Sequence, residues 1–282
     1  MDRVASKHGT QTLKVPGASL YYEVRGTGPA LLMMPGGPAD SGAFSNIREH
    51  LTSHYTVVTY DPRGISRSPL DAPVASERLV EIFADDVHRL LSAVTKEKAS
   101  LFASSGGAVI ALELAARHPE QIATLVAHEA PAPALLPDTE RRRAEMTDIV
   151  ETYRSAGVGP AMQKFMAHTG IRSGPPPATP GEPTPEMLEA MARMQQNMDF
   201  WIAGPYFSAI AAYEPDFDLL RKGSCRIVSA VGEESRGETA HQGGLGLAER
   251  LGTEAVVFPG AHGGFDSHAA EFAAKLRQVL EG

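Results

Sequence analysis

The chain of 282 residues is short of several residue types, and each shortage excludes a class of protein. Its single cysteine, Cys225, excludes an intrachain disulfide and any metal site built from several thiolates. Lys and Arg number 26 against 34 for Asp and Glu, so the net charge is −8 and no basic run stands out. We therefore expect neither nucleic acid nor a membrane as a partner. No stretch approaches the roughly 20 apolar residues of a membrane span, and residues 1–12 lack the apolar core of a signal peptide, which predicts a cytoplasmic protein.

Short apolar runs alternate along the chain with amphipathic helical patterns. The clearest helical pattern covers residues 76–94, where apolar side chains recur on one face. Short apolar runs are typical of strands that are buried on both faces of a parallel sheet. The runs are residues 30–34, 55–60, 99–103, 122–127, 226–231 and 255–258, after a predicted hairpin at 12–24. The alternation predicts an α/β fold with a mostly parallel sheet, helices on both faces, and ligands at the carboxyl ends of the strands.

The alternation fails between residues 131 and 215, where Met, Pro and long polar helical stretches dominate. This predicts one core domain, residues 1–130 and 216–282, with an inserted helical cap, residues 131–215. The proline-rich run at 174–185 predicts a semi-rigid loop or a surface linker. A methionine stripe can line an adaptable apolar pocket, although such stripes more often serve packing. The candidate substrate contacts are Gly36, Pro131, Met187, Met191, Met194, Met198, Trp201, Tyr206 and Phe207.

A serine between small residues joins the apolar run at 99–103 to a helical pattern at 108–117. This layout is typical of a nucleophile elbow, in which Ser105 sits on a sharp strand-to-helix turn. Only small neighbours fit beside such a turn, and the pattern G-x-S-x-G is met except that Ala103 replaces its first glycine. A plain Ser/Gly turn that binds phosphate at a helix start is the alternative interpretation.

A serine nucleophile needs a base, and the base needs an oriented acid. His262 is the candidate base because it follows the last predicted strand in a glycine-flanked loop; His128 and His268 are alternatives. Glu129 is the preferred acid because it ends the strand at 122–128. Glu233 and Glu234 remain alternatives, in a loop that has Ser235 where a G-x-x-D pattern would place aspartate.

Backbone N–H groups must also stabilise the oxyanion that forms on attack. Pro38 has no N–H, so Gly37, which follows the strand at 30–34, is the expected donor together with Gly106. Asp61 and Arg63, after the next strand, are expected to fix a turn by contacting each other.

Four segments together resemble the α/β-hydrolase superfamily: the elbow, PGGP at 35–38, YDPRGISRS at 60–68 and FPGAHGG at 258–264. Within it, SSGGAV at 104–109, HEAP at 128–131 and WIAG at 201–204 resemble the zearalenone-type lactone hydrolases. This resemblance implies a triad of Ser105, His262 and Glu129, oxyanion donors Gly37 and Gly106, and Trp201 over the substrate.

We therefore expect a serine hydrolase that cleaves an apolar ester or lactone through an acyl-enzyme on Ser105, with a zearalenone-like macrolactone as the candidate substrate. A general carboxylesterase or perhydrolase, and a non-catalytic ligand-binding receptor on the same fold, are the alternatives. We expect no cofactor and no metal, and a monomer or homodimer.

Overall fold

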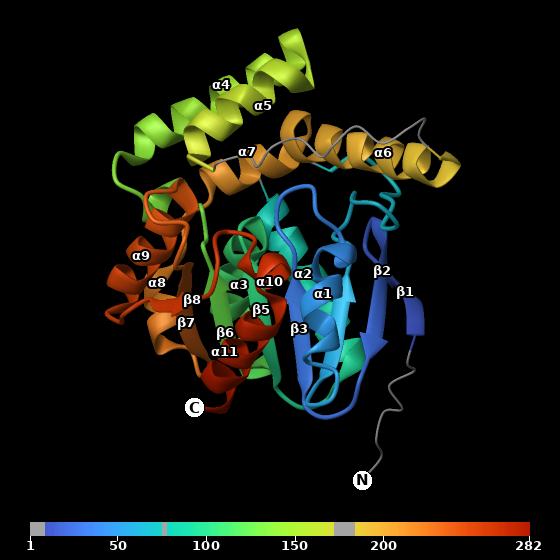
Figure 1. The fold of residues 1–282 in the computed structure, drawn as a ribbon, viewed down its shortest axis with the longest axis vertical. Coiled ribbons are helices and arrows are strands. Elements are labelled where there is room, and N and C mark those ends of the chain that lie inside the picture. Colours follow the sequence, from blue (N-terminus) through green and yellow to red (C-terminus); the bar gives the residue numbers. More distant parts are fainter. Residues whose placement is uncertain (1–8, 75–77, 172–183) are drawn as a thin grey trace.

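A computed structural model describes residues 9–74, 78–171 and 184–282. Within these ranges, eight strands form one sheet in the order β1-β2-β4-β3-β5-β6-β7-β8, with helices on both of its faces (Figure 1). The pairs β1–β2 and β2–β4 are antiparallel, and every pair from β4 to β8 is parallel. The predicted fold class, a mostly parallel sheet between helices, is confirmed. The strands are β1 (Gly9–Val15), β2 (Ala18–Arg25), β3 (Ala30–Met34), β4 (Thr56–Tyr60), β5 (Ala99–Ser104), β6 (Ile122–His128), β7 (Arg226–Gly232) and β8 (Val256–Phe258).

The helices connect these strands and also form a separate layer across one end of the sheet. In Figure 1 that layer consists of α4, α5, α6 and α7. The helices are η1 (Ser41–Phe44), α1 (Ser45–Glu49), α2 (Leu79–Val94), α3 (Gly106–Arg117), η2 (Pro119–Gln121), η3 (Pro133–Leu135), α4 (Thr139–Ala156), α5 (Val158–Thr169), α6 (Pro185–Met198), the π-helical turn η4 (Asp199–Ala203), α7 (Pro205–Ala212), α8 (Phe217–Lys222), α9 (Thr239–Leu251), α10 (Gly264–Ser267) and α11 (Ala269–Glu281). None of the helices in the described ranges has the length and hydropathy of a membrane-spanning segment.

Two apolar cores lie on opposite faces of the sheet, because successive side chains of a strand point to opposite sides. In β3, Leu32 and Met34 join the core formed with α2 and α3. Leu31 and Met33 join the other core, which includes side chains of α1 and α11. All five residues of β3 are buried, which explains its continuous apolar run. Edge strand β8 departs from this expectation, because Val257 is 47% exposed.

The structure contradicts the expected contact of Asp61 and leaves parts of two predicted segments untested. The predicted contact between Asp61 and Arg63 is wrong. The chain reverses at Gly64 (φ +77°), so Arg67 comes beside Asp61, with Nε 2.8 Å from Oδ2. Arg63 instead pairs with the buried Asp86 of α2, with Nε 2.6 Å from Oδ2. Residues 76–77 of the predicted helix and 174–183 of the predicted proline-rich loop lie outside the described residues.

Candidate active site

Ser105 occupies the sharp turn between β5 and α3. Its backbone has φ +58° and ψ −129°, a conformation that residues with a side chain rarely adopt. The turn is held by the Ser105 N–H, which donates to the carbonyl of His128 at 2.9 Å. The strained geometry leaves the Ser105 side chain on the wall of a pocket.

Glycines allow the β3–η1 loop to approach this turn closely. A Cβ on Gly36 would lie 2.6 Å from the Gly106 nitrogen and 2.7 Å from the Ser105 Cβ, and one on Gly107 would lie 2.5 Å from the Pro35 carbonyl oxygen. Neither position has room for a larger residue. Gly37, at φ +61°, lines the pocket with Ser105 and Gly106, so its backbone and that of Gly106 border the same space.

The carboxylate of Glu129 is fully buried and bonded through both oxygens. Its Oε2 lies 2.6 Å from Nδ1 of His262. Its Oε1 accepts from the Gly232 N–H at 2.8 Å and from the hydroxyl of Ser235. Glu129 directly follows β6 with φ +51°, and its N–H donates to the Ala230 carbonyl of β7 at 2.9 Å. These contacts fix the carboxylate, and with it the ring of His262, which lines the pocket.

The hydrogen bonds to Glu129 favour its ionised form. Burial alone would raise the pKa of this carboxyl, but the bonds from His262 and Ser235, with the nearby histidine rings, lower it to about 2. A carboxylate that stays charged holds the Nδ1–H tautomer of His262. Because Nδ1 carries its proton toward Glu129, the other ring nitrogen, Nε2, is unprotonated and can accept a proton in the pocket.

The alternative residues named from the sequence lie elsewhere. Glu233 and Glu234 are exposed, and Oε1 of Glu234 is 3.9 Å from Nε2 of His268. His128 is fully buried, with Ser104 Oγ 3.3 Å from its Nδ1. Burial lowers the pKa of His128 to about 4, so this ring is neutral at pH 7. None of these four residues lines the pocket that contains Ser105.

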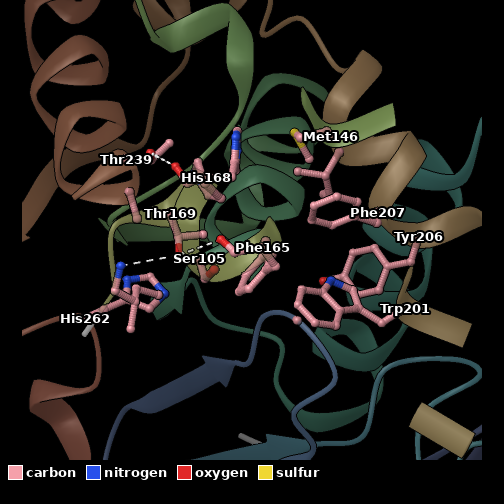
Figure 2. Close-up of a pocket in the computed structure, with 16 residues that line it drawn as sticks. Ser105, Met146, Phe165, His168, Thr169, Trp201, Tyr206, Phe207, Thr239 and His262 are labelled. Atoms are coloured by element: carbon pink, nitrogen blue, oxygen red, sulfur yellow. Dashed lines mark hydrogen bonds between the residues drawn. The ribbon is translucent and has the colours of Figure 1, made fainter. Parts of the chain in front are cut away.

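Side chains of α4, α5 and α7 close the pocket over Ser105. In the view of Figure 2, the rings of Trp201, Tyr206 and Phe207 lie on the side opposite His262. Trp201 belongs to the π-helical turn η4, and Phe165 and Phe207 pack edge-on against it at centroid distances of 5.1 and 5.5 Å. The lining residues are Gly37, Ser105, Gly106, Pro131, Met146, Phe165, His168, Thr169, Ile171, Trp201, Tyr206, Phe207, Ile210, Thr239, Ala240 and His262. The pocket is therefore mainly apolar away from Ser105 and His262.

Several candidate contacts do not line this pocket. Gly36 packs behind the Ser105 turn, and Met198 packs against the apolar core. Met191 and Met194 are 63% and 50% exposed, because their face of α6 points to solvent. The side chain of Met187 is outside the described part of the structure.

Sequence reasoning missed three polar residues of the site. His168 lines the pocket, and its Nδ1 lies 2.8 Å from Glu145 of α4. Ser235 bonds Glu129, and His241 Nδ1 lies 3.1 Å from the Ser235 oxygen. Only Ser235 carried a signal in the sequence, the serine in place of aspartate, whereas the two histidines stand in ordinary helical patterns. Across the described residues, no group of three His, Cys, Asp or Glu side chains could hold a metal ion.

Comparisons with known proteins agree with this architecture. The family model for the alpha/beta hydrolase fold matches residues 29–198. An uncharacterized hydrolase, YraK, of Bacillus subtilis (strain 168) is 37% identical over 278 residues, covering 96% of this chain and 95% of the relative. A zearalenone hydrolase of Bionectria ochroleuca is 25% identical over 267 residues, covering 93% and 94%.

A solved structure of a thermophilic esterase from Thermogutta terrifontis has a TM-score of 0.70 at 20% identity, covering 96% of this chain and 98% of that one. At this identity the likeness concerns the fold. The family model and the near full-length relative carry the assignment further: the chain belongs to the α/β-hydrolase family, and it is a hydrolase.

Proposed function

We propose that the protein is a serine hydrolase that cleaves a carboxylic ester or lactone through an acyl-enzyme on Ser105. The observation that carries this proposal is the contact between His262 and the buried, ionised carboxylate of Glu129, beside a pocket that also contains the strained Ser105. An oriented base next to a serine on a strand-to-helix turn is the arrangement that nucleophilic acyl transfer requires.

In the first half of the reaction, Ser105 Oγ forms a bond to the carbonyl carbon while its proton moves to Nε2 of His262. The carbonyl oxygen becomes an oxyanion, which the N–H groups of Gly37 and Gly106 stabilise. Glu129 stabilises the imidazolium ion and keeps its charge. When the tetrahedral intermediate collapses, the bond to the alcohol oxygen breaks and that oxygen takes the proton from His262.

In the second half, a water molecule attacks the acyl-enzyme. Nε2 of His262 takes one proton from the water while the oxygen bonds to the acyl carbon. The second intermediate expels Ser105 Oγ, which recovers its proton from His262, and the carboxylic acid leaves. For a lactone substrate the alcohol remains attached to the acid, so the product is one ring-opened hydroxy acid.

For the substrate, we propose a zearalenone-like macrolactone, with residues 131–215 acting as a cap over it. The apolar lining from Met146, Phe165, Trp201 and Phe207 suits a large apolar ring. Similarity to a zearalenone hydrolase over nearly the whole chain supports the same substrate class.

The test is hydrolysis by purified protein of zearalenone, a simple lactone and p-nitrophenyl butyrate, followed by mass spectrometry. We expect ring opening of zearalenone that is lost in Ser105→Ala and retained in Ser104→Ala, a neighbouring serine outside the pocket. Turnover of p-nitrophenyl butyrate alone would support the serine hydrolase and exclude the macrolactone. Activity retained in Ser105→Ala would overturn the acyl-enzyme mechanism.

A further inference from the structure

The hydroxyl of Tyr206 is a buried polar group without a hydrogen bond to any residue that the structure describes. Tyr206 belongs to α7, is 1% exposed, and packs its ring against Phe83 of α2 at a centroid distance of 5.0 Å. Its Oη has no hydrogen-bond partner among the described residues. A buried hydroxyl left unpaired destabilises a fold, and one that lines a pocket can be paired by a ligand bound there.

This hydroxyl lies directly over Gly106. A Cβ on Gly106 would be 2.9 Å from the Tyr206 Oη and 3.7 Å from the Gly37 nitrogen. The hydroxyl therefore borders the same space as the backbone N–H groups of Gly37 and Gly106, the expected oxyanion donors beside Ser105. Tyr206 and Gly106 both line the pocket (Figure 2). The absence of a side chain at Gly106 is what leaves room for the hydroxyl, so the two residues are complementary.

The hydroxyl is also held in a form that can donate. Burial raises the pKa of Tyr206 above its ordinary value, so the group is protonated throughout the neutral range. Its ring is fixed between α2 and the other side chains of the core, so little reorganisation is needed to present the O–H. A fixed donor in a site shielded from water stabilises a developing negative charge strongly.

We propose that Tyr206 supplies a third hydrogen-bond donor, through Oη, to the oxyanion that the N–H groups of Gly37 and Gly106 hold. The inference rests on the proposed acyl transfer at Ser105 and adds a catalytic residue to it. Within the described part of the free enzyme the hydroxyl has no partner, because the tetrahedral oxyanion that it would bond exists only during the reaction.

The test compares Tyr206→Phe with Tyr60→Phe. Tyr60 is a matched control because it is also a fully buried tyrosine with an unpartnered hydroxyl among the described residues, but it does not line the pocket. We expect Tyr206→Phe to lower kcat for p-nitrophenyl butyrate by about 10- to 100-fold, with KM within about twofold. Tyr60→Phe should leave both constants unchanged. Both variants should keep or slightly raise the Tm, because each removes an unpaired buried hydroxyl.

A second measurement uses phenylboronic acid, which adds to a serine Oγ as a tetrahedral anion while the serine proton passes to the histidine. Its Kd should rise in Tyr206→Phe by a factor similar to the loss in kcat, and stay unchanged in Tyr60→Phe. Such parallel changes would not arise from a role in packing.

Three results would overturn the inference while leaving Ser105 chemistry in place: an unchanged kcat in Tyr206→Phe, an equal loss in Tyr60→Phe, or an effect confined to KM. In each case the wild-type protein would be active and Ser105→Ala inactive. A wild-type protein that hydrolyses no ester or lactone would instead overturn the proposed function, and this inference with it.

Discussion

The two sides of the pocket differ in the polar groups that they carry. On the strand-end side, formed by the loops after β5, β6, β7 and β8, the Glu129 carboxylate has three donors among the described residues, namely His262, Gly232 and Ser235. On the cap side, formed by α4, α5, η4 and α7, rings and methyl groups dominate, and the buried Tyr206 hydroxyl has no partner in the described part of the chain.

This difference indicates that the two sides have different roles in catalysis and in substrate selection. A carboxylate in a dry site must be fully bonded, because an unpaired buried charge is very costly, and this requirement fixes its position. An apolar surface has no such requirement, so the cap side can follow the shape of a substrate while the strand-end side stays rigid. We expect changes on the strand-end side to act on kcat. On the cap side we expect changes of the apolar side chains to act on substrate choice, whereas loss of the Tyr206 hydroxyl should act on kcat.

The largest effect is expected when the strand-end side loses its charge. Glu129→Gln should lower kcat for p-nitrophenyl butyrate by about 10³- to 10⁴-fold, because an amide cannot stabilise the imidazolium ion of His262. Steady-state kinetics measure this loss, and circular dichroism checks the fold. Glu234→Gln is the control, since Glu234 is exposed and should have no effect. A loss below about tenfold in Glu129→Gln would assign the acid to another residue.

The strand-end side should also be sensitive to acid, because His128 behind it is buried and neutral. Its pKa is about 4 in the folded protein, below the ordinary 6.5 of the unfolded chain. As pH falls, the unfolded chain binds the proton first, so stability is lost between pH 6.5 and 4. We expect the free energy of unfolding to fall by about 2 kcal/mol from pH 7 to 4.5 through this group.

Urea unfolding at the two pH values measures that fall, with His128→Leu as the comparison. The variant lacks the titrating ring, so its stability should change correspondingly less between pH 7 and 4.5. An equal fall in both proteins would show that other groups cause the acid sensitivity.

On the cap side, Trp201→Ala should change the preference between substrates. Loss of the indole removes apolar contact area that only a large substrate covers, so kcat/KM for zearalenone should fall about 100-fold and that for p-nitrophenyl butyrate less than tenfold. Met194→Ala, on the exposed face of α6, is the control. Equal losses on both substrates would show that Trp201 supports the folded structure of the pocket and does not select the larger substrate.

The smallest effect is expected at Ser235, which positions the Glu129 carboxylate. Ser235→Ala removes one of its three donors, and we expect kcat to fall about tenfold with KM nearly unchanged. Ser229→Ala is a matched control, because this buried serine donates to the Gly244 carbonyl and is not among the described hydrogen-bond donors to Glu129. Equal values of kcat in the two variants would contradict a positioning role for Ser235.

Much of the fold could be predicted because its signals are local. The buried runs at 30–34 and 122–127 appear as strands that match or differ by one residue, since a strand covered on both faces must be apolar throughout. The same local signals place Ser105 between a strand and a helix and Glu129 at a strand end. The exposed face of α6 was not predictable in this way, because its methionines fit a packed stripe and a solvent-facing one equally well.

The sequence by itself thus determined the alternation of strands and helices along the chain and indicated the residues that could carry out acyl transfer. Only the tertiary structure decided which polar groups meet. Glu129 and Ser235 lie 106 positions apart and Gly106 and Tyr206 lie 100 positions apart, and both pairs meet only through strand pairing and helix packing. Such long-range contacts depend on register and on the paths of loops, which no local pattern of residues encodes.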